Sequence, residues 1–120
     1  IRDVDSHQDL PHMIRTYLNE HYMQELQQTD VAAVFHMSGP YFSQYFKQSF
    51  GVNYVQYLNS LRIEKAKLLL VTTQNSTESI GELVGIPNVN YFFRLFKKTE
   101  GCTVREYRKR HTESKKVHKS

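Results

Sequence analysis

One segment of this 120-residue chain occurs twice, and this repeat restricts the possible folds more than any other feature. The first copy, Tyr41-Phe42, Phe46-Lys47, Gly51 and Tyr57, recurs at an offset of 50 as Tyr91-Phe92, Phe96-Lys97, Gly101 and Tyr107. Upstream, Phe35 and Met37 match Val84 and Ile86 at an offset of 49, so the second copy has one extra residue in its turn. Because internal repeats determine architecture, the sequence predicts two copies of one small folding unit.

Each copy has the pattern of a short helix, a tight turn, a second helix and a glycine stop, which is a helix-turn-helix unit. Ser38 and Asn88 are expected to cap the second helix of each copy through their side-chain oxygens. Gly51 and Gly101 suit the position just after a helix, where φ is positive. In the second copy, an i, i+3, i+4, i+7 spacing predicts the buried face, formed by Phe92, Leu95, Phe96 and Thr99.

Caps and apolar spacing predict the remaining helices. Asp9 is expected to cap a first helix, and Thr77 is expected to cap the helix that opens the second copy. A helix from Gln28 to about Phe35 is expected to bury Val34, and a long helix from Tyr54 to about Val71 is expected to link the two units. We therefore expect an all-α chain of about seven helices, with no strand of consequence.

Gly81 is predicted to lie inside the helix that Thr77 opens. Glycine in a helix interior costs about 1 kcal/mol relative to alanine. Gly81→Ala is therefore expected to raise stability by roughly 0.5–1 kcal/mol, provided that the backbone is helical and a methyl group fits.

The domain organisation follows from these elements. We expect a linker remnant (residues 1–8), the first helix-turn-helix subdomain (9–53), a linking helix (54–71), the second helix-turn-helix subdomain (72–111) and a disordered basic tail (112–120). Because the chain begins with Ile1, we expect it to be part of a larger protein whose sensing, receiver or dimerisation domain lies N-terminal to it.

The positive charge is concentrated in one half of the chain. Residues 1–60 contain three Lys/Arg and six Asp/Glu, whereas residues 61–120 contain thirteen Lys/Arg and six Asp/Glu. A basic half indicates a polyanionic partner such as nucleic acid, although membrane surfaces attract the same charge. The single cysteine, Cys102, excludes an internal disulfide and fits a cytoplasmic location, and no apolar run is long enough to span a membrane.

The second copy resembles the signature of the AraC/XylS family of bacterial transcription regulators. The resemblance runs from about Leu10 to Arg110 and rests on Ile80-Gly81, Val84-Gly85-Ile86, Asn88, Tyr91-Phe92, Arg94, Phe96-Lys97, Gly101, Thr103 and Tyr107-Arg108. Three packing or capping positions depart from the usual pattern, because Gly81, Ile86 and Val104 stand where alanine, phenylalanine and proline are common. The resemblance implies sequence-specific binding of double-stranded DNA and an activator with RNA polymerase as a further partner, although the sequence itself leaves activation and repression open.

The resemblance also implies which residues meet DNA, through the second helix of each copy in successive major grooves. The positions that align with the family's base-reading face are Pro40, Ser43, Gln44, Val89, Asn90, Phe93 and Arg94. Chemistry supports two of these roles, since arginine pairs with guanine and asparagine with adenine. The expected phosphate contacts are Ser38, Lys47, Asn88, Lys97 and Lys98.

Some alternatives remain open. Phe93, Pro40 and Val89 can pack against a neighbouring helix or contact a thymine methyl group. The whole chain can instead be a basic helical protein-interaction module that lacks sequence-specific DNA binding. An enzyme finds no support, because the sequence has no phosphate-binding glycine loop, metal-ligand cluster or nucleophile–base pair, and we expect no cofactor or metal.

Overall fold

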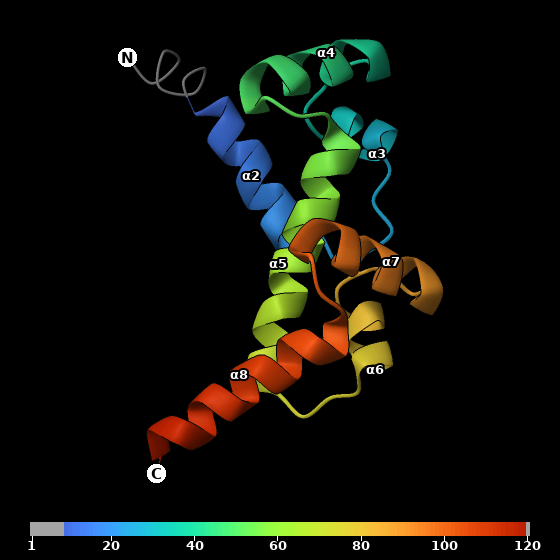
Figure 1. Cartoon of the computed structure of the whole chain (residues 1–120). Coiled ribbons are helices and arrows are strands. Elements are labelled where there is room, and N and C mark those ends of the chain that lie inside the picture. The colour runs from blue at the N-terminus through green and yellow to red at the C-terminus, as the bar shows by residue number, and fades with distance from the viewer. Residues whose placement is uncertain (1–8, 120) are drawn as a thin grey trace. The chain divides into compact units, whose positions relative to one another are not determined.

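The computed structural model describes the backbone of residues 9–119 and the side chains of residues 9–112. This part of the chain consists of helices without a strand (Figure 1). The seven helices are α2 (Leu10–His21), α3 (Gln28–Val34), α4 (Gly39–Phe50), α5 (Tyr54–Thr72), α6 (Thr77–Leu83), α7 (Val89–Glu100) and α8 (Val104–Lys119). The all-α prediction is confirmed, whereas the expected linker remnant, residues 1–8, lies outside the described residues.

The chain divides into two compact units, and the division falls inside α5. In the first unit, the start of α5 is part of the core, because Tyr54 is buried and its hydroxyl donates to the carbonyl oxygen of Leu26 at 2.8 Å. In the second unit, Leu70 near the end of α5 is buried, and its carbonyl oxygen accepts from Nε of Arg108 at 3.1 Å. The predicted linking helix therefore also contributes side chains to both cores.

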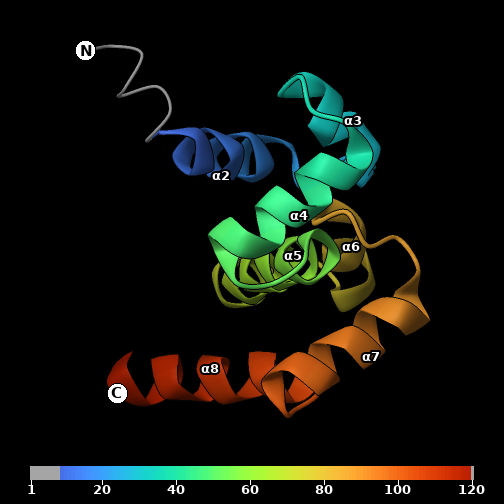
Figure 2. The same cartoon turned by 90° about the horizontal axis from the view of Figure 1, so that it is seen from above.

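Two helix-turn-helix pairs recur in the chain, α3–α4 and α6–α7 (Figure 2). Their turns are closed by equivalent backbone hydrogen bonds. The N–H of Met37 donates to the carbonyl oxygen of Ala32 at 2.9 Å, and the N–H of Ile86 donates to that of Gly81 at 2.8 Å. The sequence repeat is thus a structural repeat with the same turn.

The second helix of each pair has the predicted ends. Ser38 Oγ accepts from the N–H of Tyr41 at 3.3 Å, and Asn88 Oδ1 accepts from the N–H of Tyr91 at 2.9 Å. The left-handed residues that end the two helices are Gly51 at φ 78° and Gly101 at φ 80°. Without a Cβ, glycine adopts this conformation at little cost, so both helices stop after the same number of turns.

Aromatic contacts hold each of these helices to the helix that follows. The rings of Phe46 and Tyr57 lie edge to face with centroids 5.4 Å apart, and those of Phe96 and Tyr107 repeat this arrangement at 5.6 Å. Such pairs contribute about 0.5–1.5 kcal/mol beyond the area that they bury. The core of each unit is therefore built around the repeated aromatic positions.

Several local predictions differ from the structure. Asp9 occupies the N-cap position of α2 but makes no side-chain cap hydrogen bond. Ser76 caps α6 in place of Thr77, because its Oγ accepts from the N–H of Ser79 at 3.0 Å. Val34 is 45% exposed, since the buried stripe of the short helix α3 is centred on Val31 and Ala32.

On α7, Phe92 and Phe96 are buried as predicted, but Leu95 is only half-buried and Thr99 is exposed. The buried face is therefore narrower than the predicted stripe.

The C-terminal helix is longer than the sequence predicts. The backbone is helical through Lys119, whereas the prediction assigns residues 112–120 to a disordered tail. This segment has no apolar stripe, but it also contains no glycine or proline, and lysine and glutamate have high helix propensity. Ser120 lies outside the described residues.

Gly81 is buried against the α6–α7 turn, so the space assumed in the sequence analysis is missing. A Cβ at this position would lie 2.9 Å from Cδ2 of Phe92 and 3.0 Å from the carbonyl oxygen of Ile86. We expect Gly81→Ala to lower the free energy of unfolding by roughly 1–3 kcal/mol, because the added methyl overpacks a turn that includes backbone. Thermal unfolding measures this change, and a melting temperature equal to or above wild type would contradict the close packing.

The backbone of the turn residue His36 in the α3–α4 pair is strained, whereas that of its counterpart in the α6–α7 pair, Gly85, is not. His36 has φ 61°, and the equivalent Gly85 has φ 92°. A non-glycine residue in this region costs about 1–2 kcal/mol, partly offset by the greater unfolded-state freedom of glycine. We expect His36→Gly to raise the unfolding free energy by about 0.5 kcal/mol and the matched Gly85→Ala to lower it by about 1–2 kcal/mol. Denaturant unfolding measures both changes. If the two substitutions changed the free energy of unfolding by the same amount in the same direction, the result would argue against strain at His36.

The caps of α5 and α8 are also repeated, with one change of charge. Asn53 and Gln56 exchange backbone-to-side-chain hydrogen bonds at 3.3 and 2.9 Å, and Thr103 and Glu106 do the same at 2.8 and 3.1 Å. The N–H of Thr103 and then its hydroxyl hold the pKa of Glu106 below its ordinary value of 4.5. The α8 cap is therefore sensitive to acid, whereas the neutral α5 cap is not.

Because the folded pKa of Glu106 is lowered, its contribution to stability is present above pH 4.5 and is lost as the pH falls through the folded pKa. We expect Glu106→Gln to reduce the loss of melting temperature on acidification, while Gln56→Ala lowers the melting temperature at every pH. Thermal unfolding across this range tests the difference. An unchanged acid dependence in Glu106→Gln would show that this cap does not titrate with folding.

Candidate nucleic-acid interface

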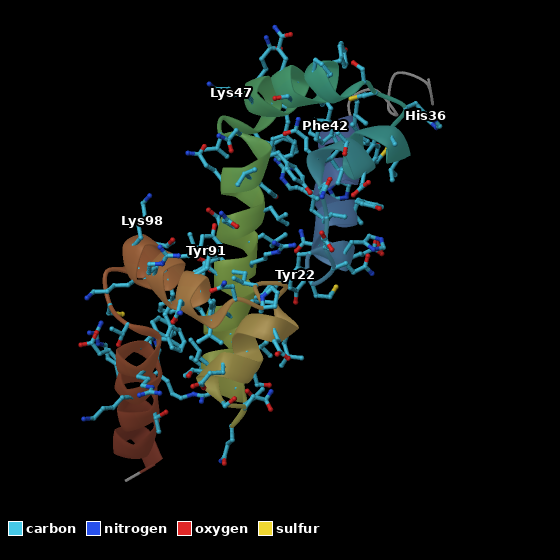
Figure 3. The ribbon with its side chains drawn as sticks, turned by 90° about the vertical axis from the view of Figure 1, so that its right-hand side faces the viewer. Tyr22, His36, Phe42, Lys47, Tyr91 and Lys98 are labelled. Carbon is cyan, nitrogen blue, oxygen red and sulfur yellow. The ribbon has the colours of Figure 1, made fainter. Side chains whose placement is uncertain are left out.

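The free face of α4 is polar and exposed. Phe42 and Phe46 bury the opposite side of this helix, and its exposed side chains include Pro40, Ser43, Gln44 and Lys47 as well as Tyr41, Gln48 and Ser49. Figure 3 shows Phe42 on the inner side of α4 and Lys47 pointing away from the ribbon. All three predicted base-reading residues of the first copy, together with one predicted phosphate contact, are thus accessible on one helix.

The free face of α7 is more strongly basic. The exposed side chains of α7 include Asn90, Arg94, Lys97 and Lys98, and Figure 3 shows Lys98 projecting from the helix. Nε of Arg94 donates to the carbonyl oxygen of Asn90 at 3.4 Å, and its guanidinium carbon lies 6.0 Å from the ring centroid of Tyr91. Tyr91 thus lies beside Arg94, a neighbour that the sequence analysis does not assign to the site.

Three apolar candidates differ in accessibility. Pro40 is exposed, whereas Val89 and Phe93 are half-buried. The ring centroid of Phe93 lies 5.9 Å from that of Phe92, and Phe93 also lines a hollow at the start of α8. Packing and DNA contact both stay open for Phe93, because its ring lies against Phe92 and is still partly accessible.

The two cap residues keep hydrogen-bond donors that capping does not use. Ser38 accepts the helix N–H through Oγ, which leaves its hydroxyl hydrogen available, and Asn88 accepts through Oδ1, which leaves its amide NH2 available. A phosphate oxygen is an acceptor that fits either donor. Capping is thus compatible with the phosphate contacts predicted for Ser38 and Asn88.

An ion-pair group supports the C-terminal end of α7. Nζ of Lys67 lies 3.0 Å from Oε1 of Glu100 and 3.1 Å from Oε1 of Glu64, and 5.9 Å from the ring centroid of Tyr107. The hydrogen bond to Glu100 is the main cause of a raised pKa of Lys67. The sequence indicates acidic neighbours for this lysine but cannot identify Glu100, because α5 and α7 are distant along the chain.

Metal centres and membrane-spanning helices are two other features that the described residues could form. Over those residues, no group of three or more His, Cys, Asp or Glu side chains is arranged to hold a metal ion. In the same region, no helix combines the length and apolar character needed to cross a membrane.

The fold and these faces define a helix-turn-helix DNA-binding domain. A family model described as a helix-turn-helix domain matches residues 31–110. The chain therefore belongs to the AraC-type family of helix-turn-helix transcription regulators, as its motifs predict.

Relatives of known sequence agree with this assignment. The chain is 39% identical over 93 residues to the HTH-type transcriptional regulator YisR of Bacillus subtilis, covering 78% of this chain and 32% of YisR. It is 32% identical over 111 residues to the HTH-type regulator YijO of Escherichia coli, covering 92% of this chain and 39% of YijO. The chain thus spans only about a third of the length of these two relatives.

Solved structures show the same architecture. The C-terminal domain of the two-component response regulator yesN from Fusobacterium nucleatum has a TM-score of 0.80 and 36% identity, covering 83% of this chain and 98% of that chain. The DNA-binding domain of AdpA, solved in complex with a target DNA, has a TM-score of 0.82 and covers 86% of this chain and 93% of that chain. At 21% identity, the similarity to AdpA concerns the fold. Together with the family match, these findings identify this domain as the DNA-binding domain of a transcription regulator.

Proposed function

We propose that this domain recognises specific sequences of double-stranded DNA by placing α4 and α7 in successive major grooves. Such grooves are centred about 34 Å apart along one face of the duplex. The observation that carries the proposal is the structural repeat: both helices begin at a side-chain cap, end at a left-handed glycine and leave a polar face exposed. Two equivalent reading elements on one chain suit a target with two adjacent half-sites.

In this proposal, polar residues of the two helices read base edges. Arg94 makes a two-pronged contact with guanine, and Asn90 makes one with adenine. Ser43 and Gln44 hydrogen-bond to bases from α4. The apolar surfaces of Pro40, Val89 and Phe93 face the duplex, where thymine methyl groups offer apolar contact. The exposure of these side chains, complete or partial, supports the assignment.

Other residues position the domain without reading sequence. Lys47, Lys97 and Lys98 contact phosphates, and the hydroxyl of Ser38 and the amide of Asn88 donate to phosphate oxygens at the helix starts. These contacts fix the register in which α4 and α7 enter the grooves. Their exposed positions on or beside the reading faces support this role.

Transcription activation in a bacterial cytoplasm, with RNA polymerase as a partner, is part of the same proposal. One relative, 31% identical over 96 residues, is the bifunctional transcriptional activator and DNA repair enzyme AdaA of Bacillus subtilis. The chain covers 46% of that protein, and its activator description supports the regulatory part of the proposal. Reporter transcription in vitro with purified polymerase tests it.

Selection of preferred sites from random duplex DNA tests the proposed function directly, and the selected sites are then titrated at several salt concentrations. A selected consensus with two adjacent half-sites is the expected result. Affinity should fall with salt, with a log–log slope of about −0.9 for each neutralised phosphate. Binding without sequence preference would instead support a basic interaction module, and a slope near zero would exclude phosphate contacts.

Two substitutions on α7 should affect DNA binding in different ways. We expect Arg94→Ala to relax the base preference at one or two positions, because a two-pronged guanine contact contributes about 1–3 kcal/mol of discrimination. Lys97→Ala should weaken all sequences alike and make the salt slope shallower by about one unit. Site-selection profiles measure this difference, and circular dichroism controls for folding. If Arg94→Ala folds normally and selects the wild-type sequence, specificity depends on α4 or DNA shape.

A further inference from the structure

A hollow lies beside the reading face of α7, where α8 begins. It is lined by Phe93, Arg94, Lys97, Thr103, Val104 and Arg105. Phe93 is half-buried and Val104 is buried, so they provide an apolar floor, whereas the three basic side chains are exposed around them. The hollow therefore offers apolar contact and positive charge to the same ligand.

Arg105 is the basic residue of this group that has no role in the proposed function. Its side chain is 77% exposed, and its Nη2 lies 3.9 Å from Oε2 of Glu78 on α6. Exposed ion pairs of this kind contribute little stability, so an anion of higher charge density can displace the carboxylate. Glu78 has a second partner, because its Oε1 accepts from the hydroxyl of Thr77 at 2.9 Å.

Two backbone N–H groups at the start of α8 already have side-chain partners. The N–H of Thr103 is bonded to Glu106, and the N–H of Glu106 is bonded to Thr103. Glu106 also places a negative charge in the first turn of α8, near Lys97 and Arg110. The long basic side chains on the rim supply the positive charge that an anion bound here would meet.

We propose that this hollow holds one deoxyribose-phosphate unit of the DNA backbone next to the groove that α7 reads, with Arg105 and Lys97 on the phosphate and Phe93 and Val104 under the sugar. The proposal rests on the proposed function of α7. Charge complementarity selects the occupant, because three cations surround an apolar floor and a nucleotide backbone combines anionic oxygens with an apolar sugar ring. Glu78, which is the partner of Arg105 in the free protein, competes with the phosphate when DNA binds.

The first test compares two single-charge removals on α8. Arg105→Ala should weaken binding of selected and unrelated duplexes equally, by about fivefold near physiological salt, and make the salt slope shallower by about 0.9. Arg110→Ala removes the same charge from the same helix but does not line the hollow, so it should change affinity by much less. Equal losses in the two variants would overturn the proposal, because they would indicate only long-range attraction.

The second test uses a substitution that should strengthen DNA binding instead of weakening it. Glu78→Gln removes the competing carboxylate and should tighten binding, but it should have no effect when combined with Arg105→Ala. Tightening of the same size in the absence of Arg105 would show that Glu78 acts through general repulsion of DNA. Circular dichroism and melting temperature control for folding in each variant.

A third test locates the phosphate. Duplexes that carry one neutral methylphosphonate in place of a phosphate are scanned along the preferred site. At one position, neutralisation should weaken wild-type binding more than it weakens binding of Arg105→Ala, which keeps only the Lys97 contact to that phosphate. If every position weakens both proteins alike, Arg105 makes no backbone contact, although wild-type sequence preference would still support the proposed function of α7.

Discussion

The edge-to-face contact between a recognition-helix phenylalanine and a tyrosine of the next helix, Phe46–Tyr57 and Phe96–Tyr107, is the interaction on which each unit depends. A 12-residue helix such as α4 or α7 is marginal in water on its own, so its stability comes from packing. The aromatic contact fixes the rotation of the helix about its axis as well as its position. It therefore also decides which side chains face outward.

This dependence explains what the sequence predicts well and where it fails. Repeated aromatics, caps and glycine stops are local signals, and they predict the two helix-turn-helix pairs and the start and end of α7. Gly81 is different, because its helix propensity is a property of α6 whereas its constraint comes from Phe92 and the Ile86 carbonyl across the turn. Likewise, the lack of an apolar stripe in the last residues indicates weak packing, but their high helix propensity allows α8 to continue.

The candidate site shows the same division between local and distant information. Once Phe92 and Phe96 define the buried side of α7, helical geometry places Arg94 and Lys97 on the exposed side, so periodicity alone identifies them. Periodicity cannot identify Arg105, because its association with Phe93 depends on the turn between α7 and α8. Partner identities such as Lys67–Glu100 are also tertiary properties.

The exposed faces of α4 and α7 differ in charge, and under the proposed function this difference gives the two helices different roles in DNA recognition. The exposed face of α4 carries one lysine, Lys47, beside Ser43 and Gln44, whereas that of α7 carries Arg94, Lys97 and Lys98. Phosphate contacts attract every sequence alike, so under the proposed function α7 supplies most of the salt-dependent affinity. Once α7 is bound, α4 meets its half-site as an intramolecular event at high effective concentration. A few neutral hydrogen bonds from α4 then suffice to distinguish sites, since they need only discriminate among duplexes that α7 already holds.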